Sequence, residues 1–128
     1  MTYNNSTVAW VSVSNGIFIC MQCAGKYRGL GVAKSFVKSI TLDSWSAREV
    51  ELMRKGGNQR LRDFFAEYHI KTEFPLTMRF SFLALYYYKL MLAAEVDGTA
   101  APPKPSLEDG WKHYDNPNDV PKLYSPYQ

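Results

Sequence analysis

Residues 10–45 read WVSVSNGIFICMQCAGKYRGLGVAKSFVKSITLDSW, and this stretch decides the expected fold. Apolar and polar residues alternate over residues 11–14, Asn15-Gly16 is a strong hairpin-turn signal, and residues 17–19 form a short apolar run. A second alternation spans residues 35–42 and is rich in β-branched side chains. The stretch therefore predicts a hairpin and a further strand, separated by a bend into a glycine-rich segment at 24–31.

Downstream of this stretch the apolar pattern becomes helical. Ser46 and Glu49 have the spacing of a capping box, and Gly56-Gly57 is expected to end that helix. Asn58 is expected to cap the next helix, whose apolar residues recur at helical spacing: Leu61, Phe64, Phe65 and Tyr68. The longest helix is expected over residues 77–96.

Composition bounds the class of protein. The chain has 128 residues, of which 46% are hydrophobic and 21% charged, an ordinary globular balance that excludes a wholly disordered chain, a collagen or a disulfide-dense mini-protein. Six of the seven prolines lie in the last 30 residues. We therefore predict one α+β domain over residues 1–98, followed by a flexible proline-rich tail over residues 99–128.

Targeting signals are not apparent. Residues 1–5 lack the basic and apolar regions of a secretory signal. The most apolar stretch, residues 83–94, is interrupted by Lys89 and falls short of the ~20 residues that span a bilayer. With two cysteines at metal or redox spacing and no signal peptide apparent, the expected environment is a reducing compartment.

Positive charge is concentrated in the middle of the chain. Between Lys26 and Arg62 there are nine basic residues and three acidic ones, a net charge of +6 in 37 residues. Such a face suits an acidic partner, such as a GTPase surface, phosphate, anionic lipid or nucleic acid, or it is a solvated face with no partner. Nucleic acid is not the expected partner.

Cys20 and Cys23 have the spacing of half a tetrahedral zinc site. No second cysteine pair follows, and His69 and His113 are expected to be ordinary histidines rather than ligands. A thioredoxin-like redox site is disfavoured, because that fold places a βαβ unit around the motif and only 19 residues precede Cys20. The residues alone therefore indicate half of a zinc site.

Arg28 follows Cys23 by five residues and is itself followed by Gly29 and Gly31. An arginine held on a tight turn suits an arginine finger, which enters another protein's active site and stabilises charge on a transferring phosphoryl group. Spacing alone leaves open the alternative of a surface arginine in a basic patch.

Taken in order, these motifs strongly resemble the Arf GTPase-activating protein (ArfGAP) domain. The resemblance rests on residues 10–45, continues through Met53, Gly56-Gly57-Asn58 and Phe64-Phe65, and covers roughly three quarters of the chain. Residues 101–110, APPKPSLEDG, look like the proline-rich segment that follows the domain in its Golgi-type members.

The resemblance implies a small antiparallel sheet surrounded by helices and built around one four-cysteine zinc finger, with Cys20 and Cys23 among the Zn²⁺ ligands. It implies a GTP-loaded Arf-family GTPase as the partner and Arg28 as the arginine finger. Trp10 and Asp43 match residues that pack beside this arginine and orient it. The implied location is the cytoplasm, peripheral to Golgi or vesicle membranes.

The sequence also departs from the family pattern. Counting back from Cys20 places the family's second cysteine at Tyr3, so the first zinc pair is missing, and residues 3–9 diverge. Tyr27 and Ala33 replace two common histidines. Three accounts stay open: an incomplete or alternatively started product, a domain that folds without zinc, or a non-catalytic structural subunit. In the last case four tail aromatics would dock along a neighbouring chain: Trp111, Tyr114, Tyr124 and Tyr127.

Overall fold

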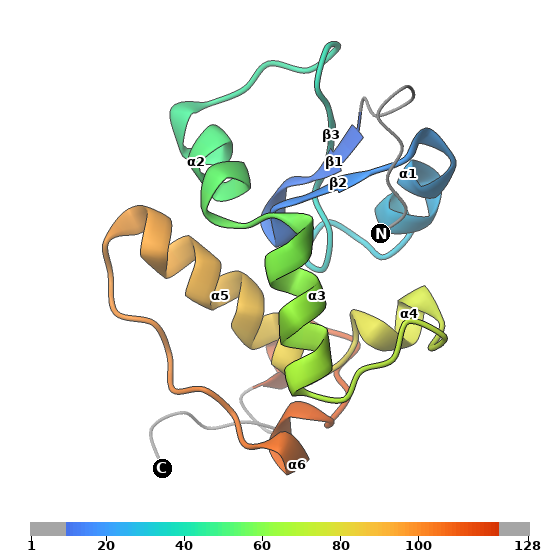
Figure 1. Ribbon diagram of the computed structural model, residues 1–128, viewed down its shortest axis with the longest axis vertical. Coiled ribbons are helices and arrows are strands. Elements are labelled where there is room, and N and C mark those ends of the chain that lie inside the picture. Colours follow the sequence, from blue (N-terminus) through green and yellow to red (C-terminus); the bar gives the residue numbers. More distant parts are fainter. Residues whose placement is uncertain (1–9, 121–128) are drawn as a thin grey trace.

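The computed structural model describes residues 10–120 and shows an α+β fold (Figure 1). Its strands are β1 (Trp10–Ser12), β2 (Ile17–Ile19) and β3 (Val37–Ser39). Its α-helices are α1 (Met21–Arg28), α2 (Ala47–Lys55), α3 (Asn58–Glu67), α4 (Leu76–Arg79), α5 (Leu83–Asp97) and α6 (Leu107–Gly110). Two 3₁₀ turns are η1 (Val13–Asn15) and η2 (Pro117–Asp119).

The three strands form one antiparallel sheet in the order β2-β1-β3. This confirms the predicted hairpin and third strand, although each strand is only three residues long. The hairpin turns through η1 and Gly16 (φ 65°), rather than through a two-residue Asn15-Gly16 turn. Two features favour glycine at position 16: the positive φ angle, and the close approach of the Leu52 carbonyl oxygen, which would lie 2.9 Å from a Cβ atom there.

Asn58 closes one edge of the sheet, and the prediction that it caps the next helix is wrong. Its side-chain oxygen accepts the Phe18 amide at 2.8 Å, and its side-chain nitrogen donates to the Phe18 carbonyl at 2.9 Å. A carboxamide carries both a donor and an acceptor, so it can pair with one residue of an edge strand. Gly57 is the N-cap of α3 instead.

The capping box of α2 is confirmed. The Ser46 hydroxyl accepts the Glu49 amide at 3.1 Å, and the Glu49 carboxylate accepts the Ser46 amide at 2.9 Å. The helix ends at Gly56 as expected. The predicted apolar face of α3 is also confirmed, since all four of its residues are buried: Leu61, Phe64, Phe65 and Tyr68.

The single long helix predicted over residues 77–96 is wrong. The chain forms α4 and α5, and residues 80–82 break the helix between them. Backbone groups at the break pair with the C-terminal segment: Leu83 donates to the Lys112 carbonyl (2.8 Å), and Tyr114 donates to the Ser81 carbonyl (3.0 Å). These hydrogen bonds take the place of the hydrogen bonds that a continuous helix would form. Phe80 and Phe82, at the break, are fully buried.

Residues 99–120, here called the C-terminal segment, pack on the domain, whereas the sequence predicts a flexible tail. The Tyr68 hydroxyl donates to the Pro105 carbonyl, and the Trp111 indole donates to the Tyr68 carbonyl. Tyr114 and Val120 are buried against Leu83. Trp111 and Tyr114 thus dock on their own chain, while Tyr124 and Tyr127 lie outside the described residues.

Most of the buried apolar side chains form one core between the sheet and the helices. Among residues 10–120, no helix has the length and apolar character needed to cross a bilayer.

Two buried tyrosines offer a matched test of this packing. Tyr88 is fully buried, and its hydroxyl has no hydrogen-bond partner among the described residues. We expect Tyr88→Phe to raise the free energy of unfolding by about 1 kcal/mol, because it removes an unsatisfied buried hydroxyl. Tyr68→Phe should lower it by about 0.5–1.5 kcal/mol, because the bond to Pro105 is lost. Urea denaturation measures both, and equal shifts in the two variants would contradict this assignment.

Candidate functional site

Arg28 is the last residue of helix α1. The sequence did not predict this helix. The segment was predicted as a bend because three glycines occur between residues 25 and 31. In the structure, Cys20 is the N-cap, and the helix runs to Arg28. The missed signal is the local spacing of Ala24 and Tyr27, which are the two buried residues of the helix.

Tyr27 anchors the end of α1. Its side chain is 1% exposed, and its ring meets Phe80 edge to face at a centroid distance of 5.4 Å. Burial raises the pKa of the Tyr27 hydroxyl above its usual value, so the group stays protonated. Arg28 is exposed, because the neighbouring side chain of the helix occupies the core.

The guanidinium of Arg28 lies over the ring of Trp10, 5.4 Å from the ring centroid. A cation–π contact at an exposed site is worth about 0.5–1 kcal/mol. That is enough to bias the side chain toward one direction and too little to bury its charge. Within residues 10–120 no ion pair involves Arg28, so its planar fork of donors is available to a partner.

Asp43 is bonded to the strand that pairs with Trp10. Its carboxylate accepts the Ser39 amide at 2.7 Å, and the Trp45 indole donates to the Ser39 carbonyl at 3.1 Å. Ser39 is the cross-strand partner of Trp10 in the β1–β3 pairing. The structure therefore brings Trp10 and Arg28 into contact, whereas Asp43 holds the strand residue opposite Trp10 and has no recorded contact with Arg28.

The turn after Arg28, residues 29–35, is held by hydrogen bonds within the turn and by one hydrogen bond to the sheet. Gly31 (φ 91°) donates to the Arg28 carbonyl at 3.1 Å and accepts the amides of Lys34 and Ser35 at 3.1 and 2.9 Å. The Ser35 hydroxyl lies 2.7 Å from the Ser12 hydroxyl. On the outer side of this turn Val32 is 74% exposed. A charged arginine thus stands beside apolar surface on a well-bonded turn, an arrangement that suits contact with another protein.

The predicted zinc ligands Cys20 and Cys23 lie together at the start of α1, with their sulfur atoms 2.7 Å apart. The described residues contain no group of three or more metal-ligating side chains. His113 pairs with Phe82 in an isolated β-bridge, and residues 1–9 include no Cys, His, Asp or Glu. Two thiols are half of a tetrahedral donor set, so these residues do not fit a closed structural zinc site.

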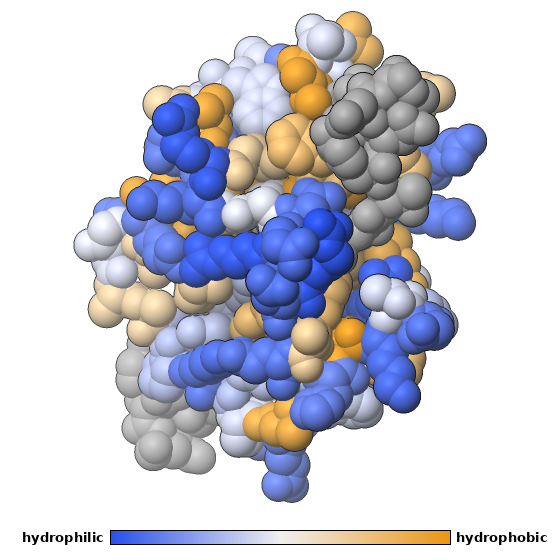
Figure 2. Space-filling view, in the orientation of Figure 1, coloured by the Kyte–Doolittle hydropathy of each residue, from blue (hydrophilic) through white to orange (hydrophobic). Residues whose placement is uncertain are grey.

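Much of the basic charge in the middle of the chain is neutralised in the fold. Two carboxylates of α5 pair with basic residues there: Asp97 with Arg48 (2.8 Å) and Glu95 with Arg60 (2.5 Å). Lys38 and Arg54 pair with acidic residues of α2. Figure 2 shows that hydrophilic side chains cover much of the face on which α3 lies. Four of the nine basic residues between Lys26 and Arg62 are therefore paired with carboxylates.

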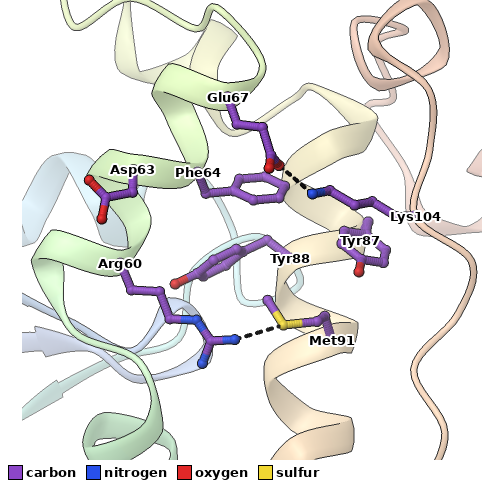
Figure 3. Close-up of a pocket in the computed structure, with 8 residues that line it drawn as sticks. All are labelled: Arg60, Asp63, Phe64, Glu67, Tyr87, Tyr88, Met91 and Lys104. Carbon is purple, nitrogen blue, oxygen red and sulfur yellow. Dashed lines mark hydrogen bonds and ion pairs between the residues drawn. The ribbon is translucent and has the colours of Figure 1, made fainter.

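A separate pocket of about 260 Å³ lies between α3 and α5 (Figure 3). Its aromatic side chains are Phe64, Tyr87 and Tyr88, and Lys104 of the C-terminal segment reaches Glu67 across one end. Burial raises the pKa of Tyr88 to about 12. The sequence analysis did not anticipate this pocket, because its lining comes from three segments far apart in the chain. None of its lining residues belongs to the arginine site.

A family model described as "Putative GTPase activating protein for Arf" matches residues 4–84. The ADP-ribosylation factor GTPase-activating protein GCS1 of Saccharomyces cerevisiae is 42% identical over 71 residues, which is 56% of this chain and 20% of that protein. The sporulation protein SPS18 of the same yeast is 40% identical over 88 residues, or 68% of this chain and 29% of that protein.

A crystal structure from Cryptosporidium parvum, described as a "putative GTPase activating protein for ADP ribosylation factor", has a TM-score of 0.61 and 32% identity to this chain. The match covers 69% of this chain and 71% of that one. The chain spans less than a third of the length of the curated relatives it matches. Sequence and fold agree, and the chain belongs to the ArfGAP family.

Proposed function

We propose that this chain is a GTPase-activating protein for an Arf-family small GTPase in its GTP-bound form, and that Arg28 is the arginine finger. The observation that carries the proposal is the exposed Arg28 guanidinium, held over Trp10 at the end of α1 and in no ion pair within the described residues. Family membership supports the same activity.

The chemistry of this proposal is electrostatic. The GTPase holds the nucleotide and the attacking water, and the finger stabilises the negative charge that develops on the transferring phosphoryl group. A guanidinium suits this role because its donors lie in one plane and span two oxygen atoms. Tyr27 and Trp10 hold the arginine from the core and from the sheet, so little side-chain freedom has to be lost when the partner docks.

Asp43 contributes to positioning in this proposal. It holds Ser39, which pairs with Trp10, and Trp10 lies beneath the finger. Residues 101–110, which resemble a segment of Golgi-type members, are the basis for proposing a cytoplasmic location peripheral to Golgi or vesicle membranes.

A second candidate function is a non-catalytic interaction module with the same fold. The observation in its favour is the donor set at Cys20 and Cys23, which does not fit the closed zinc site that the family resemblance implies. In this case the exposed Arg28 and Val32 form part of a binding surface, and no GTP hydrolysis is stimulated.

Arg28→Lys separates the two functions. We expect it to bind the GTP-loaded GTPase nearly as tightly as the wild type but to lose most of the stimulated hydrolysis, because lysine is a point charge without the planar fork. Fingers supplied in trans are worth about 10³–10⁵ in rate. Single-turnover GTP hydrolysis measures the loss, with Arg54→Lys as a matched control on the exposed face of α2. Equal stimulation by wild type and Arg28→Lys would refute the finger assignment.

Chelation tests the metal site. Because only two thiols are in place, we expect the purified chain to hold much less than one tightly bound zinc and to melt at the same temperature with or without a strong chelator. Metal analysis and calorimetry measure these quantities. About one zinc per chain together with a chelator-induced loss of stability would show that two further ligands complete the site.

A further inference from the structure

The turn that follows Arg28 is tied to the C-terminal segment through Lys34. The Lys34 ammonium donates to the Ser81 hydroxyl at 3.0 Å and lies over the Tyr114 ring, 5.0 Å from its centroid. Its carbonyl accepts the side-chain amide of Asn15 at 3.0 Å. One lysine therefore joins the arginine turn, the hairpin and the C-terminal segment.

Tyr114 is placed rigidly enough to act as a support. It is 2% exposed, its amide donates to the Ser81 carbonyl at 3.0 Å, and its ring meets Tyr86 edge to face at 5.4 Å. The Lys89 ammonium lies 3.5 Å from its hydroxyl. Burial and the neighbouring Lys34 lower the pKa of Lys89 to about 7. Within residues 10–120 neither lysine forms an ion pair with a carboxylate, and the π-face of Tyr114 gives Lys34 a favourable electrostatic contact.

The position of Lys34 is transmitted to Arg28 through short backbone bonds. The Lys34 amide donates to the Gly31 carbonyl, and the Gly31 amide donates to the Arg28 carbonyl, each at 3.1 Å. The Ser35 amide shares the same Gly31 carbonyl. Movement of Lys34 away from Tyr114 therefore loosens the turn that begins at the last residue of α1.

We propose that Lys34 and Tyr114 form a latch through which the C-terminal segment positions the arginine turn. Both are positioning residues, and the activity readout rests on the proposed function. Tyr114 lies outside residues 4–84, the part of the chain that the family model matches. The latch thus extends the functional unit beyond the matched domain and into the segment that the sequence predicts as a tail.

Amide hydrogen exchange tests the latch without any GTPase. In Tyr114→Leu, which removes the π-face, we expect the Gly31, Lys34 and Ser35 amides to exchange about three- to thirtyfold faster, the range of a cation–π contact between exposed and desolvated limits. Tyr114→Phe keeps the ring and should restore slow exchange. Unchanged exchange in Tyr114→Leu, or equally fast exchange in the leucine and phenylalanine variants, would overturn the latch.

Activity gives a second readout. We expect Tyr114→Leu to lower the maximal rate of stimulated GTP hydrolysis about three- to thirtyfold, with the KM for the GTPase changed less than about twofold, because Tyr114 is buried and does not contact the partner. Lys34→Met should give a similar loss, and the double variant should be no worse than Lys34→Met alone, since both substitutions remove the same contact between Lys34 and Tyr114. Additive losses would overturn the latch.

The outcomes separate this proposal from the one it rests on. If wild type stimulates hydrolysis, Arg28→Lys does not and Tyr114→Leu behaves as wild type, the latch is wrong and the finger stands. If wild type gives no stimulation with any Arf-family GTPase, the proposed function is wrong, and hydrogen exchange still decides the latch. Should Tyr114→Leu fail to fold, the exchange measurement on Lys34→Met decides it instead, because that change leaves the buried ring in place.

Discussion

Burial of Tyr27 against Phe80 is the interaction on which the candidate site depends. It fixes the last turn of α1 and leaves Arg28 facing outward. Full burial of an aromatic side chain is worth roughly 1.5–3 kcal/mol, whereas a complete structural zinc site contributes about 10–16 kcal/mol. One tyrosine does not make up this difference. The remaining support for α1 and its turn comes from the Trp10 ring, the Ser12–Ser35 contact and the attachment of Lys34.

Trp10 and Asp43 are linked to Arg28 in different ways. Trp10 touches Arg28 directly, while Asp43 reaches it through Ser39 and the β1–β3 pairing. Each strand of the sheet has three residues, so one lost hydrogen bond is a large share of the pairing between two strands. The Asp43 carboxylate is thus linked to Arg28 only through Ser39 and Trp10.

The C-terminal segment changes how the domain is delimited. Its backbone pairs with residues 81–83, and these bonds explain why one apolar stretch forms two helices. Its prolines and charged residues resemble a linker in composition, yet Trp111 and Tyr114 pack against the domain and Lys104 pairs with Glu67. Ion pairs also join distant parts of the chain, because Asp97 and Glu95 of α5 pair with Arg48 and Arg60.

Local sequence determined the features that depend on neighbouring residues. These are the hairpin, the capping box of α2, the buried face of α3, the end of α5 at Gly98 and the family motif around Arg28. Tertiary structure decided what depends on partners far along the chain: the break at residues 80–82, the pairing of Asn58 with Phe18, the pocket between α3 and α5, and the docking of Tyr114 beside Lys34. Periodicity and spacing encode which face of an element is apolar. They do not encode which distant backbone group or ring will satisfy it, because that partner is brought close only when the whole chain packs.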